Sequence, residues 1–157
     1  MSQQRYRHEN FKDRNNDPLL AKVAETKSPL LLGGRLSAIQ LLTRRPIVLD
    51  VPAIDGMVYV PEAGPLIYPV MKEVYGIDLL KENTGQMSLG EVLDPQPFQS
   101  RSVEEWMRLA EKYQFTEVLV RQGYDLRLPL LMQQDFYKLY RIPSVLEDRN
   151  QKTENRK

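Results

Sequence analysis

Apolar residues recur along the chain in short blocks whose spacing alternates between helical and strand-like. The first block predicts a helix that begins at Asp17-Pro18, because aspartate is a favoured N-cap residue and proline is tolerated in the first helical turn. An unbroken apolar run at 29–32 is typical of a buried strand, and Gly33-Gly34 ends it. A helical block at 36–43 and the apolar triplet 47–49 follow. They complete a strand–helix–strand unit, which predicts two parallel strands side by side.

Two more helices are predicted in the middle of the chain. Residues 65–75 have apolar positions at helical spacing, Gly76 stops the pattern, and Pro69 lies inside it. Ser102 is a predicted N-cap, and Glu105 three residues later can close a capping box. The apolar face of this second helix consists of Trp106, Leu109, Ala110 and Tyr113.

The last third of the chain has the spacing of strands. Residues 115–120 predict one strand, and residues 128–132 and 137–142 predict an antiparallel hairpin. The intervening segments 51–64 and 81–99 are predicted to be a loop and a linker, because proline and glycine interrupt the first and the second has no apolar periodicity.

This order of elements predicts the α/β class. We expect a small three-layer, Rossmann-like mixed sheet with parallel first strands and a C-terminal antiparallel hairpin. Residues 18–143 are predicted to form a single α/β domain. Residues 1–17 and 144–157 are polar, mixed in charge and without periodicity, and are predicted to be disordered tails.

Composition narrows the function classes. The chain has 157 residues, with 22 basic and 21 acidic side chains. Such a balance gives no broad positive field for nucleic acid, so no nucleic-acid partner is expected. The absence of cysteine and a single histidine, His8, exclude thiolate zinc sites, cysteine nucleophiles and Ser-His-Asp catalysis. No apolar run approaches the roughly 18 residues of a membrane span. No cofactor or metal site is predicted.

Glycines and arginines supply the first candidate site residues. Gly33 and Gly34, between a strand and a helix, could let backbone N–H groups approach a phosphate, although a tight turn alone would also explain them. Arg44 and Arg45 could clamp an anion through their guanidinium groups. The preferred interpretation is that these two arginines cap the preceding helix and pair with surface acids.

Carboxylates and a tyrosine supply the remaining candidates. Asp50, Asp55 and Glu62 are concentrated after the predicted strand 47–49, where carboxylates can act as acid and base or hold a cation. The preferred interpretation of these acids is a solvated or structural role. Tyr59, in the same loop, is a candidate for ligand contact.

The residues that carry a resemblance to a known family are spread from Gly33-Gly34 to the last predicted strand. They are Gly33-Gly34, Ile39-Gln40-Leu41, Thr43-Arg44-Arg45-Pro46, Leu49-Asp50, Tyr59, Glu62, Val74-Tyr75-Gly76-Ile77-Asp78, Glu105-Trp106, Ala110, Phe115-Thr116, Val118-Leu119, Leu128-Pro129 and Leu139-Tyr140-Arg141-Ile142-Pro143. In these segments the chain resembles the soluble C-terminal domain that follows the transmembrane helices of certain large bacterial membrane proteins of uncertain function. Some of those proteins are related to membrane glycosyltransferases that use lipid-linked sugars. The resemblance implies an appended recognition or packing domain. It assigns no catalytic residue, because catalytic carboxylates of such enzymes lie in loops beside transmembrane helices.

Two functions therefore remain open. The first is a non-catalytic accessory or interaction domain with a membrane-protein partner, and we prefer it because no catalytic constellation is present. The alternative is a small ligand-binding protein or enzyme that uses a strand-end pocket for a phosphate- or sugar-containing ligand. The sequence does not identify the cellular location.

Overall fold

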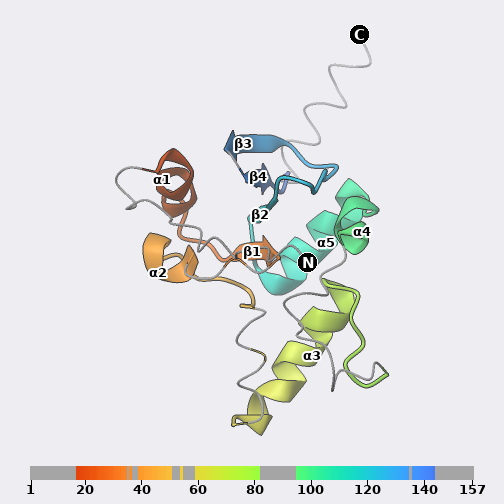
Figure 1. Ribbon diagram of the computed structural model, residues 1–157. Helices are drawn as coiled ribbons and strands as arrows, with labels where there is room; N and C mark the ends of the chain where they lie inside the picture. The colour runs from red at the N-terminus through yellow and green to blue at the C-terminus, as the bar shows by residue number, and fades with distance from the viewer. Residues whose placement is uncertain are drawn as a thin grey trace, which may run out of the picture.

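A four-stranded mixed sheet lies at the centre of the protein, with helices on either side of it (Figure 1). The computed structural model describes residues 17–34, 36, 39–50, 54, 59–81, 95–134 and 136–143. Apart from Asp17, the two predicted tails lie outside the described residues, and so do Asp55 and most of the predicted linker at 81–99.

The sheet has the strand order β1-β2-β4-β3, formed by β1 (Leu30–Gly33), β2 (Glu117–Arg121), β4 (Tyr137–Arg141) and β3 (Leu130–Gln134). β1 and β2 are parallel, whereas β2–β4 and β4–β3 are antiparallel. The α/β class, the mixed sheet and the C-terminal hairpin are thus confirmed. The three-layer, Rossmann-like arrangement is not confirmed, because only one pair of these strands is parallel, whereas Rossmann sheets are mostly parallel.

The predicted strand at 47–49 is reduced to a single parallel bridge between Leu30 and Ile47. Leu30 N donates to Pro46 O and Val48 N donates to Leu30 O, both at 2.9 Å, so the predicted parallel direction is correct. The preceding rung of a parallel ladder would need an N–H from Pro46, which proline lacks. Ser28 O instead accepts a hydrogen bond from Arg45 Nε at 2.7 Å. On the other side of the bridge, the next rung would use Leu32 O, and that oxygen instead accepts from Tyr75 OH at 2.7 Å. The ladder therefore does not extend beyond one bridge.

The helices that accompany the sheet are α1 (Pro18–Ala24), α2 (Ile39–Thr43), α3 (Gly64–Glu73), α4 (Gln96–Gln99) and α5 (Val103–Tyr113), together with the short 3-10 helix η2 (Pro61–Ala63). Asp17 Oδ1 accepts from Leu19 N and Leu20 N, which confirms the predicted start of α1. Ser102 and Glu105 form both halves of the predicted capping box of α5. α4 was not predicted, because four residues are too few to show helical periodicity.

Two apolar clusters form because successive side chains of a strand point to opposite faces of the sheet. One cluster, which we call the α5 cluster, combines sheet residues with side chains of α4, α5 and the second half of α3. The other, the α1 cluster, combines sheet residues with α1 and α2. The sheet contributes Leu31, Val118, Val120 and Tyr140 to the α5 cluster, and Leu30, Leu32, Leu119, Tyr137 and Leu139 to the α1 cluster.

Candidate functional site

Arg45 is enclosed at the amino end of the parallel strands, where only 1% of it is exposed. Its Nη1 atom pairs with the carboxylate of Glu117, the first residue of β2, which is itself 4% exposed. Further guanidinium hydrogen bonds reach Ser28 O at 2.7 Å, Val23 O at 3.2 Å and Thr116 Oγ1 at 3.4 Å. A buried charge needs such partners, because its desolvation costs several kcal/mol. Hydrogen bonds within the protein therefore occupy the guanidinium group of Arg45. Its acidic partner is the buried Glu117, whereas the sequence led us to expect a surface acid.

The neighbouring arginine has a different environment. Arg44 is exposed and has a left-handed backbone with φ 55°, directly after α2. Its backbone N donates to Gln40 O at 2.8 Å, which closes the last turn of that helix. Arg44 and Arg45 thus do not form one cationic pair facing a ligand.

Gly33 and Gly34 lie at the carboxyl end of β1 and are both buried. A Cβ on Gly33 would lie 2.6 Å from Val120 Cγ1 and 3.0 Å from Phe98 Cε1, so close packing of β1 against its neighbours requires glycine here. Gly34 has φ +135°, a conformation that side-chain-bearing residues rarely adopt. α2 has only five residues and offers little helix dipole for a phosphate.

Asp50 lies near Tyr75, whose hydroxyl donates to Leu32 O at 2.7 Å. Burial raises the pKa of the Tyr75 phenol well above its ordinary value, and the Asp50 carboxylate adds to that shift. The tyrosine therefore stays neutral and acts as a hydrogen-bond donor to the sheet. Because Tyr75 contacts β1 at Leu32, its neighbour Asp50 lies near the carboxyl end of β1, where Gly33 and Gly34 are found.

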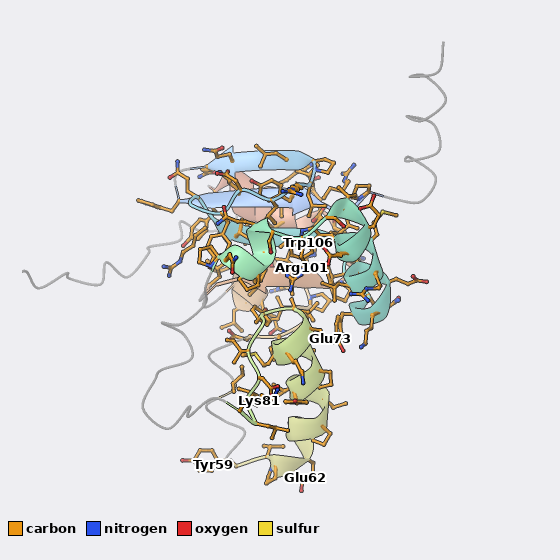
Figure 2. The ribbon with its side chains drawn as sticks, turned by 90° about the vertical axis from the view of Figure 1, so that its right-hand side faces the viewer. Tyr59, Glu62, Glu73, Lys81, Arg101 and Trp106 are labelled. Atoms are coloured by element: carbon orange, nitrogen blue, oxygen red, sulfur yellow. The ribbon has the colours of Figure 1, made fainter. Side chains whose placement is uncertain are left out.

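Tyr59 and Glu62 are far from that end of the sheet. Both are exposed and lie at the far end of α3, which projects away from the sheet (Figure 2). The structure therefore brings Asp50 toward the diglycine turn but separates it from Arg45 and from the Tyr59–Glu62 pair. Within the described ranges, no group of three or more His, Cys, Asp or Glu residues could hold a metal ion.

The projecting end of α3 changes from buried to exposed along one helix. Val70 and Met71 are 7% and 0% exposed and belong to the α5 cluster, whereas Leu66, one turn earlier, is 76% exposed. We call residues 59–69 and 78–81 the α3 arm. Of the seven large apolar side chains exposed in the described part of the chain, four are on this arm: Tyr59, Val60, Leu66 and Leu80.

Polar contacts join the two segments of the arm to each other and to Lys72 of α3. Lys72 Nζ lies 3.2 Å from Tyr68 OH and 3.1 Å from Asp78 Oδ2, and Tyr68 OH donates to Asp78 Oδ1 at 3.1 Å. The hydrogen bond from Lys72 holds the pKa of Asp78 below its ordinary value, and the bond from Tyr68 adds to it. These contacts tie the segment after Gly76 back onto α3.

Other contacts fix α3 to the sheet side of the molecule. Glu73 receives Lys112 Nζ at 2.7 Å and Tyr113 OH at 2.9 Å, both from the end of α5. Arg101 Nη2 donates to Glu73 O at 2.8 Å and Val74 O at 2.6 Å. The sequence pattern singled out neither Glu73 nor Arg101, because their partners are 27 to 40 residues away along the chain.

Comparison with known proteins adds no assignment: neither a protein-family model, nor a curated protein, nor a solved structure matches this chain. None of the helices in the described ranges combines the length and apolar character needed to cross a membrane.

Proposed function

We propose that this chain is a non-catalytic interaction module that docks on a partner polypeptide through the α3 arm. The observation that carries the proposal is the exposure of Leu66 in α3 and of Tyr59 just before that helix, at 76% and 87%, whereas Val70 and Met71 in the next turn of α3 are buried. Burying one such side chain contributes about 1.5–3 kcal/mol. Exposed apolar groups gathered on one projection are typical of interaction surfaces, and tyrosine is enriched at their centres.

The ion pairs of the described residues support a non-catalytic role. Glu73, Asp78, Glu117 and Asp125 each pair with a lysine or arginine. Asp50 and Glu62, the described members of the predicted carboxylate group, lie apart. Acid–base chemistry on one substrate needs two groups within reach of the same reacting atoms.

We infer the class of partner from the sequence resemblance: a membrane-embedded protein related to glycosyltransferases that use lipid-linked sugars. The alternative, a small ligand held at the strand ends, has less support. Its proposed residues Gly33, Arg45 and Glu62 lie at three separate places in the structure.

Capture of the partner tests the proposal. The intact chain, with a photo-crosslinking residue in place of Tyr59, is exposed to solubilised membranes and to the soluble fraction of the cells that make it. We expect one specific membrane protein to be crosslinked, and Leu66→Asp to abolish its retention by removing an apolar contact.

A matched variant distinguishes specific docking through the α3 arm from non-specific hydrophobic binding. Leu41 of α2 is a leucine of similar exposure, 82%, outside the arm, so Leu41→Asp is expected to retain the partner. Circular dichroism confirms that both variants fold. Equal loss of retention in the two variants, or no crosslinked partner in either fraction, contradicts the proposal.

A further inference from the structure

β3 is the last strand of the sheet, and among the described residues no strand pairs with its outer edge (Figure 1). The opposite edge strand, β1, is partly covered by the bridge between Leu30 and Ile47. An open edge strand presents N–H and C=O groups with which a further strand can pair, and natural sheets commonly block that pairing with charged residues or proline. β3 consists only of leucine, methionine and glutamine, so its sequence contains neither kind of block.

The hydrogen bonds of the β3–β4 hairpin show which backbone groups face the open edge. Arg141 N donates to Pro129 O at 2.9 Å. In an antiparallel pair every second residue bonds to a given neighbour, and the next two such residues of β4 pair with Met132 and Gln134. Gln133 lies between these two residues. Its N–H and C=O therefore point away from β4, toward the open edge.

The regular part of this edge is short and well held. A register shift between Leu130 and Met132 interrupts regular pairing with β4 at the start of β3. The last three residues of the strand pair regularly, and Gln133 is at their centre. Gln134 Oε1 accepts from Leu19 N at 3.1 Å, which ties the same part of the strand to α1. A second strand would therefore meet an edge that is already ordered, which lowers the entropic cost of pairing.

Exposed apolar side chains flank the edge. Leu130, at the start of β3, is 49% exposed, and Phe136, in the turn after β3, is 64% exposed. Outside the α3 arm, the described residues contain three large apolar side chains that are exposed, and the third is Leu41 of α2. Two of these three side chains thus lie at the two ends of the open edge.

We propose that two copies of this chain pair through β3, antiparallel and about a two-fold axis at Gln133. In this register the N–H of Gln133 in each copy donates to the C=O of Gln133 in the other, so the pairing uses the backbone groups that face the edge. The exposed side-chain amide of Gln133 is both donor and acceptor and can bond to its own copy. The start of each strand lies beside the end of the other, which brings Leu130 toward Phe136 of the second copy.

Charge and position both favour a second copy as the occupant. No like charges meet along the paired strands, because β3 is uncharged. The pairing also leaves the α3 arm free, since α3 projects from the other end of the molecule (Figure 1, Figure 2). The inference therefore does not depend on docking by the arm. Because a short strand pair buries little area, we expect weak association, with a Kd in the micromolar range.

Sedimentation of the intact chain over a concentration series tests the pairing. We expect monomers at low micromolar concentration and dimers as the concentration rises toward millimolar. Gln133→Pro removes an N–H that faces the edge and leaves the hydrogen bonds to β4 in place, and proline is tolerated at such edge positions. This variant is expected to weaken the dimer by about tenfold or more, because each copy loses one hydrogen bond to the other.

Charged variants at the same position test the two-fold axis. Gln133→Lys and Gln133→Glu each bring two like charges together at the axis, so each variant alone is expected to be monomeric. An equimolar mixture of the two is expected to form a mixed dimer, because opposite charges then meet. Gln40→Lys makes the same change at an exposed glutamine of α2 and is expected to dimerise as the unmodified chain does. Circular dichroism confirms that the variants fold, and the charged pair serves if the proline variant does not.

Three results overturn the proposal. The first is an unmodified chain that stays monomeric at every concentration, whether its edge then remains open or takes a strand from another protein. The second is a dimer that the folded proline variant leaves unchanged, which would place the interface elsewhere. The third is a mixture of the lysine and glutamate variants that does not pair, which would exclude an axis at Gln133.

Discussion

The sheet body comprises the four strands with α1, α2, α4, α5 and the second half of α3, and it encloses one ion pair together with the apolar clusters. The α3 arm, in contrast, leaves four of its large apolar side chains exposed. The ion pair of the body, Arg45–Glu117, has side chains 0% and 6% exposed. At the base of the arm, Asp78 pairs with Lys72 of α3, and their side chains are 16% and 50% exposed. Ion pairs and leucines therefore contribute most to stability where the body encloses them, and the exposed leucines of the arm contribute little.

The largest expected effect comes from breaking the buried ion pair. Glu117→Gln leaves the guanidinium of Arg45 without its counter-charge inside the protein, and we expect a loss of about 4 kcal/mol in the free energy of unfolding. Denaturant titration measures that loss. Asp78→Asn makes the same chemical change at the base of the arm, where the half-exposed Lys72 stays solvated without its partner, and is expected to cost far less. Similar losses in the two variants would remove the distinction between body and arm.

A comparison within one helix isolates the effect of packing. Met71→Ala is expected to cost about 3 kcal/mol, because it removes a fully buried side chain from the α5 cluster. Leu66→Ala, five residues earlier in the same helix, is expected to change stability by less than about 0.5 kcal/mol. Both values come from denaturant titration. A large loss for Leu66→Ala would show that the chain itself covers this side chain.

Glycine substitutions give an effect of intermediate size. The Cβ of Gly33→Ala would meet Val120 and Phe98, so we expect destabilisation by about 2 kcal/mol. Gly64 begins α3 with φ −52°, and a Cβ there would have no neighbour within 4 Å. Gly64→Ala is therefore expected to stabilise the protein by about 0.5 kcal/mol, because the unfolded chain loses freedom. Thermal melts of the two variants should move in opposite directions, and a shift in the same direction would contradict this account.

The elements that the sequence predicts well are those whose signals are local. The start of α1 depends on Asp17 and Pro18, and the start of α5 depends on Ser102 and Glu105, all within a few residues of the helix. The hairpin follows from two apolar runs close together in the chain. The strand at 47–49 was overestimated, because neither neighbouring rung of its bridge forms: Pro46 has no N–H for Ser28 O, and Leu32 O accepts from Tyr75 OH.

The site was harder to predict, because its contacts join distant parts of the chain. Arg45 and Glu117 are 72 positions apart, and no local pattern indicates that one is the partner of the other. The apolar spacing of 65–75 was sufficient to predict a helix, but it did not predict which turns of that helix pack against the rest of the protein. Leu66 and Val70 share one stripe of that helix, yet only Val70 belongs to the α5 cluster.

The smallest expected effect lies at the junction between body and arm, where Glu73 binds Lys112. The hydrogen bond from Lys112 holds the pKa of Glu73 below its ordinary value of 4.5. A carboxyl group whose pKa is lowered by folding stabilises the protein above its unfolded pKa, and that contribution is lost as the pH falls through the folded pKa. Glu73 is partly exposed, with 39% of its side chain accessible, so Glu73→Gln is expected to cost less than about 1 kcal/mol at neutral pH. Denaturant titrations at several pH values should show this difference constant above about pH 5 and vanishing on acidification below the ordinary pKa of glutamate. High salt should also reduce it. A difference that grows as the pH falls would mean that Glu73 is bound in its protonated form and that Lys112 does not hold the arm to the sheet body.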